Sequence, residues 1–290
     1  MRKLFILGTA IVVSVAMLMT SCKKEEVNNN GNNSNTENPG GGGSGGGSGS
    51  GGGTGSANTD YPSTAIVIHN AVTDIDGNRY DAVQIGNQVW MAENLRTTKY
   101  SDGTVIPISS STSSTIAYRY VPKNDMNYVP SYGYLYNWTA VMHGENISDD
   151  DPIGVQGICP TGWHVPNGSE WSQMKEYMKS QSLYWSNGSP NHIAKALSAT
   201  WGWDSVEEEY NVYAPGCNMS TNNATGFSAL PAGIANGGGF GSSAQFWTSS
   251  KDGSHPAYSI HWGNVYNPEF DLYYGETEEY RSLSVRCVRD

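Results

Sequence analysis

The chain has 290 residues and a formal net charge of −11. Only 16 Lys and Arg residues stand against 27 Asp and Glu residues, so the chain lacks the concentrated basic surface that binding to a nucleic-acid backbone requires. Nine Trp and 18 Tyr accompany five Phe, a mixture typical of wet cores or binding faces, because these rings bury a large area and keep a polar tip.

Residues 1–21 have the features of a secretory signal peptide. A charged start precedes the apolar run LFILGTAIVVSVAMLM, and the small residues Thr20 and Ser21 lead into Cys22. This arrangement resembles a bacterial lipoprotein signal, in which the cysteine is lipidated after cleavage. A plain signal peptide or an uncleaved membrane anchor is the alternative. We expect lipidation at Cys22, with the membrane as a partner through that anchor.

Residues 22–60 are predicted to form a disordered tether. Asn, Gly and Ser dominate this segment and cannot bury apolar surface. Its mean reach is about 35 Å, enough to hold a domain clear of a membrane surface. The KKEE that follows Cys22 resembles the charged tag of surface-exposed lipoproteins of the Bacteroidota. That resemblance implies a lipid-anchored protein of the outer membrane, exposed at the cell surface.

Residues 61–290 have the texture of one globular domain, which opens with predicted hairpins. Asp76-Gly77-Asn78 and Gly86-Asn87 are typical turns between alternating strands. The DIDGN stretch resembles the opening of a calcium loop, but Ile85 stands where the closing Glu should fall, which favours a hairpin turn. The aromatic stretch YGYLYNW, residues 132–138, predicts a strand that is either buried on both faces or a stacking surface for sugars.

Two helices are predicted in the middle of the chain. The first follows Pro166, with Asn167 as the N-cap and Glu170 completing a capping box. Its apolar face consists of Trp171, Met174 and Met178. The second lies in SPNHIAKALSATW, with Ser189 as the cap, Pro190 at the first helical position and an apolar stripe of Ile193, Ala196 and Leu197.

After Trp201 the chain has no sustained helical period. GFSALPAGI, AQFWTSS, AYSIHWG and LSVRCVRD read as short strands separated by Gly, Asn and Pro turns. The order of strands, two helices and then a long region of strands and loops predicts an α+β fold.

Six blocks resemble the Fibrobacter succinogenes major paralogous domain, in the order of that family and over residues 75–290. They are DIDGNRYDAVQIGNQVWMAENLRTTKYSDGTVIP, YGYLYNWTAV, GICPTGWHVPNGSEW, GFSALPAGI, FWTSS and SVRCVRD. The resemblance implies a C-type-lectin-like fold, with two helices, short antiparallel sheets and long loops that carry binding. It implies no activity. The triplets of calcium-dependent lectins, E-P-N or Q-P-D, are absent, so sugar binding through calcium is not supported.

The cysteines favour a structural role. With Cys22 lipidated, Cys159, Cys217 and Cys287 remain, an odd number for an oxidising compartment. No C-x-x-C motif is present, so thioredoxin-like redox sites and zinc ribbons lack their minimum geometry. We expect a disulfide between Cys159 and Cys287, worth about 4–5 kcal/mol in the loop-entropy treatment. Cys217 would then be unpaired, either buried and inert or exposed and reactive.

No catalytic residue, metal site or cofactor is predicted. None of the six histidines has a metal-ligand spacing such as H-E-x-x-H, and we expect His164 to pack near the disulfide. The carboxylate runs at 149–151 and 207–209 lack the alternation of a calcium loop, which favours solvated loops and leaves structural calcium unsupported. The chain is therefore not expected to be an enzyme.

The segment from Phe246 to Tyr280 is the predicted ligand-binding region. It is crowded with Tyr, Trp, His, Asn, Ser and Gly, the composition of adaptable binding surfaces. A tyrosine-rich meander that fills its own fold is the alternative. The predicted contacts are Trp247, Tyr258, His261, Trp262, Tyr266 and Tyr273. We expect a non-catalytic surface module that binds a glycan or a protein. The alternatives are a structural or adhesin component of a surface assembly and, less favoured, a polysaccharide-active enzyme.

Overall fold

The computed structural model describes residues 61–145, 154–207, 212–235, 237–250, 258–264, 267, 273–276 and 279–290. Within residues 258–264 and 273–276 only the backbone is described. The predicted signal peptide, the tether and Cys22 lie outside these ranges, as do the acidic run at 149–151 and Tyr266.

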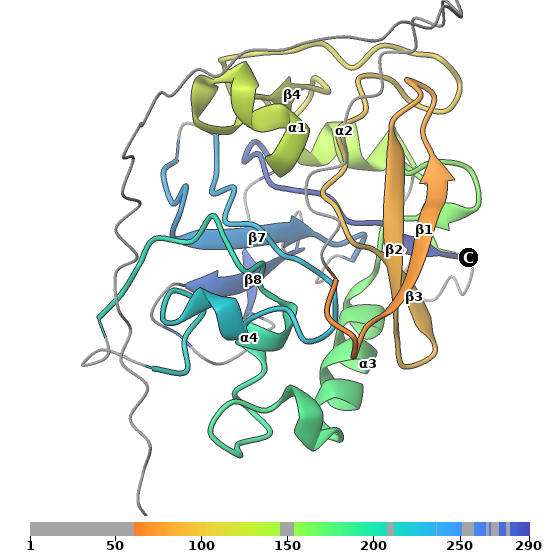
Figure 1. The fold of residues 1–290 in the computed structure, drawn as a ribbon. Helices are drawn as coiled ribbons and strands as arrows, with labels where there is room; N and C mark the ends of the chain where they lie inside the picture. The colour runs from red at the N-terminus through yellow and green to blue at the C-terminus, as the bar shows by residue number, and fades with distance from the viewer. Residues whose placement is uncertain are drawn as a thin grey trace, which may run out of the picture.

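A five-stranded antiparallel sheet joins the two ends of the domain (Figure 1). Its strands, in spatial order, are β1 (Ile66–Thr73), β2 (Arg79–Ile85), β3 (Gln88–Met91), β10 (Val288–Arg289) and β6 (Trp163–His164). The last strand of the chain therefore lies between two strands, β3 and β6, that come from much earlier in the chain. Val288 pairs with Trp90 on one side and with His164 on the other.

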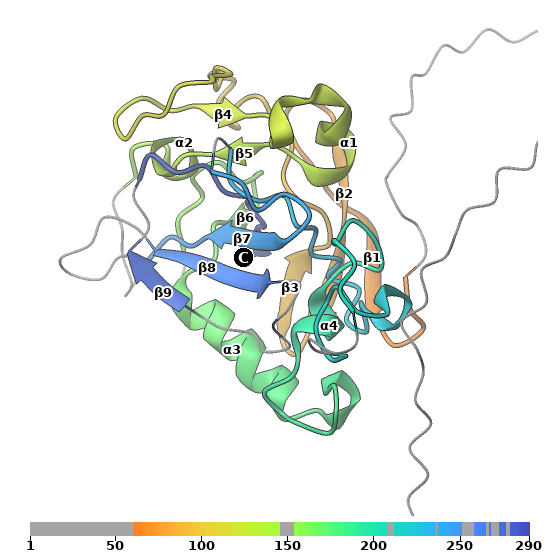
Figure 2. The same ribbon diagram turned by 90° about the vertical axis from the view of Figure 1, so that its left-hand side faces the viewer.

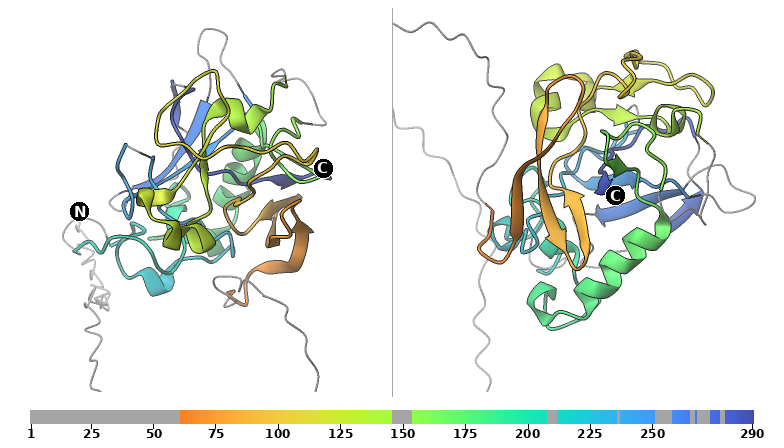
Figure 3. Two further views of the ribbon diagram at one scale, coloured as in Figure 1. Left: turned by 90° about the horizontal axis from the view of Figure 1, so that it is seen from above. Right: turned by 90° about the vertical axis from the view of Figure 1, so that its right-hand side faces the viewer.

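The central strands β2 and β3 of this sheet are largely buried on both faces. In β2, Tyr80 and Ala82 belong to one apolar cluster, while Val83 and Ile85 belong to a second. The strand alternates because successive side chains point to opposite faces. α3 (Gly168–Lys179) covers the second face (Figure 3). The ring of its Trp171 lies 4.5 Å from that of Trp90.

The predicted hairpin turn at Asp76-Gly77-Asn78 is confirmed. Gly77 N–H donates to the carbonyl of Asp74 at 3.0 Å, and Gly77 has a φ of 83°. The Asp74 carboxylate accepts hydrogen bonds from the backbone N–H groups of Asp76 and Asn78 and from the hydroxyl of Tyr80. Its oxygens thus close the turn, as in an Asx-turn.

Two smaller sheets complete the strands (Figure 2). One contains β7 (Ser243–Trp247), β8 (Tyr258–Asn264) and β9 (Tyr273–Glu276) in antiparallel order. The other pairs β4 (Arg119–Tyr120) with β5 (Leu135–Tyr136).

The described helices are mostly short. They are α1 (Val129–Tyr132), α2 (Trp138–Met142), α3 (Gly168–Lys179) and α4 (Ala194–Leu197), with 3₁₀ turns η1 (Pro122–Asn124), η2 (Met126–Tyr128), η3 (Ser182–Tyr184) and η4 (Met219–Thr221). α3 is confirmed with its full capping box, since Asn167 accepts from the N–H of Glu170 and Glu170 accepts from the N–H of Asn167. No described helix is long and apolar enough to cross a membrane.

The second predicted helix is much shorter than expected. His192 N–H donates to the carbonyl of Ser189 at 3.1 Å, so the segment with Pro190 forms a turn and α4 begins only at Ala194. The apolar stripe of Ile193, Ala196 and Leu197 is nevertheless buried. Packing of that stripe therefore does not require the extra helical turns.

The aromatic stretch at residues 132–138 is not one strand. Tyr132 ends α1, only Leu135 and Tyr136 are in β5, and Trp138 begins α2. Tyr132, Tyr134 and Tyr136 are all buried, so they do not form a surface on which sugars stack. The interpretation as a buried core segment is the one that holds.

The predicted strand Gly226–Ile234 is also irregular. Thr225 N–H and Ala229 N–H donate to the carbonyls of Ala196 and Leu197 in α4, rather than to a neighbouring strand. The observed fold is thus α+β, with few helices, short antiparallel sheets and long irregular segments.

Candidate functional site

Trp247, one of the predicted ligand contacts, is a core residue. It is fully buried in β7, and its indole N–H donates to the carbonyl of Tyr136 at 2.6 Å. Its ring lies 5.5 Å from that of Trp138. The prediction of a ligand contact is therefore wrong for this residue, because the composition of the segment does not reveal which face of a strand is covered.

The other predicted contacts stay predictions. The backbone of Tyr258, His261, Trp262 and Tyr273 lies in β8 and β9, where His261 is paired with Gln245 on one side and with Tyr273 on the other. The side chains of these four residues, and all of Tyr266, lie outside the described part of the chain.

The predicted disulfide between Cys159 and Cys287 is present. Both residues are completely buried, and their Cα atoms are 6.0 Å apart. The bond ties the segment before α3 to the strand β10. His164 pairs with Val288, the residue after Cys287, and its ring is hydrogen-bonded to Glu170 and Asp290 at 2.8 Å each. The packing of its ring near the disulfide stays a prediction.

The expectation of an unpaired Cys217 is wrong. Cys217 is buried and disulfide-bonded, and no described cysteine is free. The Lys195 ammonium binds the carbonyls of Ala214, Cys217 and Asn218, which fixes this loop. The prediction assumed that Cys22 is lipidated and hence unavailable, and it left Cys217 as the odd member for that reason.

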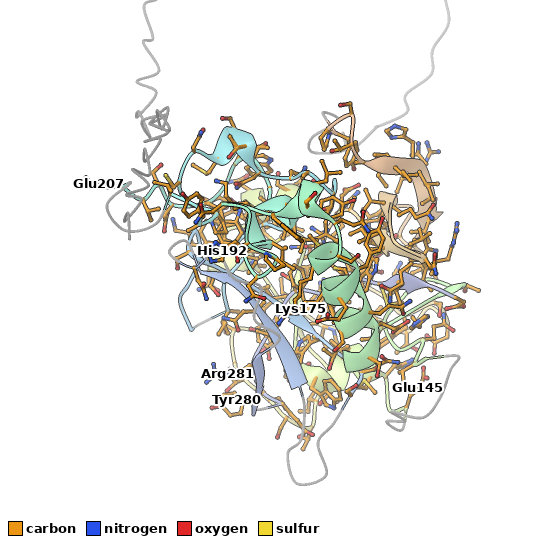
Figure 4. The ribbon with its side chains drawn as sticks, turned by 90° about the horizontal axis from the view of Figure 1, so that it is seen from below. Glu145, Lys175, His192, Glu207, Tyr280 and Arg281 are labelled. Carbon is orange, nitrogen blue, oxygen red and sulfur yellow. A yellow bond between two sulfur atoms is a disulfide. The ribbon has the colours of Figure 1, made fainter. Side chains whose placement is uncertain are left out.

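Of the two acidic runs, only Glu207 lies within the described residues. Glu207, the described member of the second run, lies at the periphery of the molecule, whereas Glu145, which precedes the first run, lies on the opposite side (Figure 4). The described part of the chain contains no group of three or more His, Cys, Asp or Glu residues that could hold a metal ion.

The strongest candidate site is a group of half-buried aromatic rings, which we call the aromatic platform. It consists of Tyr128, Trp201 and Phe240, which are half-buried, above the buried Tyr132. The ring centroid of Phe240 lies 4.7 Å from that of Tyr128 and 4.8 Å from that of Tyr132. Trp201 meets Tyr132 edge to face at 5.6 Å.

Three separate segments build this platform. Tyr128 ends η2 and precedes α1, Trp201 follows α4, and Phe240 precedes β7. The loop that leads into β7 passes beneath α1 in Figure 2. Gly202 allows the close approach of Trp201, since it has a φ of 85° and a Cβ there would lie 2.7 Å from the Tyr132 hydroxyl oxygen. Sequence patterns could not find the platform, because its rings are far apart along the chain.

Charged groups flank the platform on two sides. Lys123 Nζ lies 5.3 Å from the ring centroid of Phe240 and 5.8 Å from that of Tyr128, within cation–π range. Lys123 and Asn124 have φ values of 51° and 55°, a left-handed backbone that non-glycine residues adopt at a cost. Such strain is found more often at ligand-binding segments than elsewhere.

Asp204 supplies the opposite charge. Its backbone N–H donates to the carbonyl of Gly241 at 2.7 Å, and a Cβ on Gly241 would lie 2.5 Å from a carboxylate oxygen of Asp204. Burial, with the neighbouring Tyr128 and Asp204, raises the pKa of Tyr132 to about 12. The Tyr132 hydroxyl therefore stays neutral beside this carboxylate at physiological pH.

The described part of the chain also contains two cavities outside the platform. The larger, about 200 Å³, lies near the disulfide and is lined by residues that include Thr97, Lys99 and Ser101. Its polar groups largely bind one another or their neighbours, since Lys99 pairs with Asp76 at 3.3 Å and Ser101 accepts from Gln156. The smaller, about 20 Å³, adjoins the platform through Trp201 and also contacts Ser131 and Arg286.

The comparisons with known proteins identify a family. A family model described as the Fibrobacter succinogenes major domain matches residues 83–289. No curated protein and no solved structure matches the chain.

Proposed function

Because the chain belongs to the Fibrobacter succinogenes major domain family, whose description names no activity, we propose its function from the candidate site. The protein is a non-catalytic binding module, held at the cell surface by a lipid anchor, that binds carbohydrate on the aromatic platform. The observation that carries this proposal is the grouping of Tyr128, Trp201 and Phe240 around Tyr132, with polar and charged groups at the rim.

Carbohydrate suits this surface for a physical reason. The C–H face of a sugar ring is apolar and packs on an aromatic face, while its hydroxyl groups need hydrogen-bond partners at the edge. Lys123, Asp204 and Ser131 supply a donor, an acceptor and a group that does both. A protein ligand is the second candidate, since half-buried Tyr and Trp rings are also enriched in protein interfaces.

The fold supports the further proposal that the domain is C-type-lectin-like. The resemblance found in the sequence implies binding through long loops. Trp201 and Phe240 both come from the long irregular region between α4 and β7.

A glycan array tests the proposed function. The full chain, purified in detergent, is expected to bind a subset of glycans, whereas heat-denatured protein is not. Phe240→Ala and Trp201→Ala should each weaken binding about tenfold, the effect of removing a central aromatic contact. Tyr177→Ala is the matched control, because Tyr177 is a half-buried ring on α3 away from the platform.

Binding that survives both platform variants would contradict the assignment of the site. In that case His261→Ala and Tyr273→Ala should be tested, because these two backbone positions face each other across β8 and β9.

The anchor is tested separately at Cys22. Cys22→Ser should move the protein from the membrane fraction to the soluble fraction, and protease added to intact cells should degrade the wild-type domain. Lipidation uses the sulfur of Cys22. Because Cys159 and Cys287 are joined to each other, Cys22 is the one other cysteine of this chain with which Cys217 can pair. A lipidated Cys22 therefore requires that Cys217 pairs outside the chain. Mass spectrometry of unreduced peptides therefore shows whether Cys217 pairs within the chain or outside it.

Two other functions remain as hypotheses with their own tests. A structural or adhesin component would bring defined envelope proteins with it when the solubilised chain is captured, and would bind no glycan. A polysaccharide-active enzyme would release reducing ends from a polysaccharide panel.

A further inference from the structure

Arg286 is a buried cation without a carboxylate bonded to it among the described residues. It is 1% exposed. Nε donates to Asn94 Oδ1 at 2.8 Å, Nη1 donates to the carbonyls of Met91 and Phe227, and Nη2 donates to the carbonyl of Ser228 at 2.9 Å. A guanidinium group has five N–H donors, so one N–H on Nη2 has no partner in the described part of the chain.

This N–H belongs to a side chain that lines the smaller cavity. The cavity, which we call the Arg286 pocket, has a volume of about 20 Å³, room for one water-sized group. Its apolar wall includes Trp201, Leu230 and Ala199, and its polar wall includes Ser131 and Glu93. A buried donor without an acceptor is costly, so the pocket favours an oxygen atom at this position.

The Arg286 pocket and the aromatic platform share a wall. Trp201 lines the pocket and also packs against Tyr132, while Ser131 precedes Tyr132 in α1. Leu230 lies close to the same ring, because a Cβ on Gly202 would contact both Leu230 and the Tyr132 hydroxyl group. A sugar ring stacked on the platform therefore has the pocket at its edge.

The chemistry of the walls decides which substituent fits. A carboxylate is disfavoured, since Glu93 lines the same pocket, Asp204 flanks the platform and the whole chain carries a net charge of −11. A single hydroxyl group would satisfy the N–H but would leave the apolar wall uncovered. An acetyl group both accepts from the N–H and covers the apolar wall. Its carbonyl oxygen lies at Arg286 and its methyl group lies against Trp201 and Leu230.

We propose that the Arg286 pocket receives the carbonyl oxygen of the acetamido group of an N-acetylated sugar whose ring is stacked on the aromatic platform, with the methyl group at the mouth of the pocket against Trp201 and Leu230. This inference rests on the proposed function and adds the class of sugar to it. The Arg286 N–H donates to the carbonyl oxygen of the acetamido group.

The test compares two trisaccharides that differ only at C2. N,N′,N″-triacetylchitotriose and cellotriose have the same β-1,4-linked backbone, with an acetamido group or a hydroxyl group at that carbon. The full chain in detergent should bind the acetylated trisaccharide at least about tenfold more tightly in calorimetry, since the C2 hydroxyl group of cellotriose leaves the apolar wall uncovered. Equal affinities, or a preference for cellotriose, would overturn the proposal and leave the proposed function standing.

If the chain binds neither trisaccharide and no glycan on the array, both this proposal and the proposed function are overturned.

A pocket variant provides an independent check. Ser131→Leu places a larger side chain in the wall of the pocket and should reduce the ratio of the two affinities to about twofold or less. Ser131→Ala keeps the cavity open and should retain the preference. Retention of the full preference by a folded Ser131→Leu protein would contradict the pocket, and the wild-type comparison decides the question if that variant does not fold.

Discussion

Arg286 lies in the centre of the domain, where its guanidinium group is bonded to three backbone carbonyls and to Asn94. It also stacks over Phe227, with 4.4 Å between its Cζ atom and the ring centroid. Burial lowers the pKa of Arg286 to about 9, so the charge is retained at physiological pH. The side chain thus joins β3, the Phe227 segment and the end of the chain, while one donor remains for the candidate pocket.

Arg286→Lys should destabilise the protein by about 3 kcal/mol. A lysine ammonium cannot reproduce the fork of five donors, and carbonyls left without a partner cost about 1–3 kcal/mol each. Arg289→Lys, three residues further on at an exposed position, should change the free energy of unfolding by less than about 0.5 kcal/mol. Urea denaturation compares the two, and equal losses would contradict a structural role for Arg286.

His164 should make stability depend on pH. Burial alone would lower the pKa of His164, but the hydrogen bonds and negative charges of Glu170 and Asp290 outweigh burial and raise it above 6.5. A raised folded-state pKa stabilises the protein fully below the unfolded value near 6.5. This contribution is lost as the pH rises through the folded-state pKa.

The measurement is the melting temperature of wild type and His164→Gln between pH 5 and 9. The difference between the two proteins should be largest at the acidic end and should shrink as the pH rises above about 6.5. A difference that grows with pH would contradict the ion pairs of His164 with Glu170 and Asp290.

At the scale of elements, α3 shows why some of them are readable from the sequence. Its capping box, apolar stripe and length are all local, so the pattern at residues 167–178 predicts it correctly. The region around α4 cannot be predicted from local sequence patterns. There, hydrogen bonds from Thr225 and Ala229 to α4 organise the chain, and they join residues that no local pattern connects.

Asn167→Ala should destabilise the protein by about 1 kcal/mol, because the N–H of Glu170 loses its side-chain acceptor at the start of α3. Asn191→Ala, at an exposed position in the turn before α4, is the matched control and should have little effect. Thermal unfolding measured by circular dichroism separates the two. Similar melting temperatures for both variants would contradict the role of the cap.

At the scale of the molecule, the end of the chain is locked into its beginning. β10 lies between β3 and β6, and the bond from Cys159 to Cys287 fixes the same junction with a sequence separation of 128 residues. The two apolar clusters on either side of the five-stranded sheet meet at this strand.

Replacing both Cys159 and Cys287 with alanine should reduce the free energy of unfolding by about 2–5 kcal/mol, since the unfolded chain is no longer constrained. Urea denaturation of the double variant and of wild type measures the difference. If the difference in the free energy of unfolding between the two proteins disappears once both have been reduced, the disulfide bond itself is responsible for it. An unchanged stability under oxidising conditions would contradict it.

The sequence by itself determined the α+β class, the helix that follows Pro166, the first hairpins and the family, because caps, turns, alternation and signature blocks depend on residues that are neighbours in the chain. The pair of Cys159 and Cys287 could be predicted because the chain has only four cysteines. The sequence could not determine that Trp247 is a core residue, that Cys217 is paired or that α4 is short. It also could not bring Tyr128, Trp201 and Phe240 together. Those outcomes depend on which surfaces meet when segments far apart in the chain pack, and only the tertiary structure decides that.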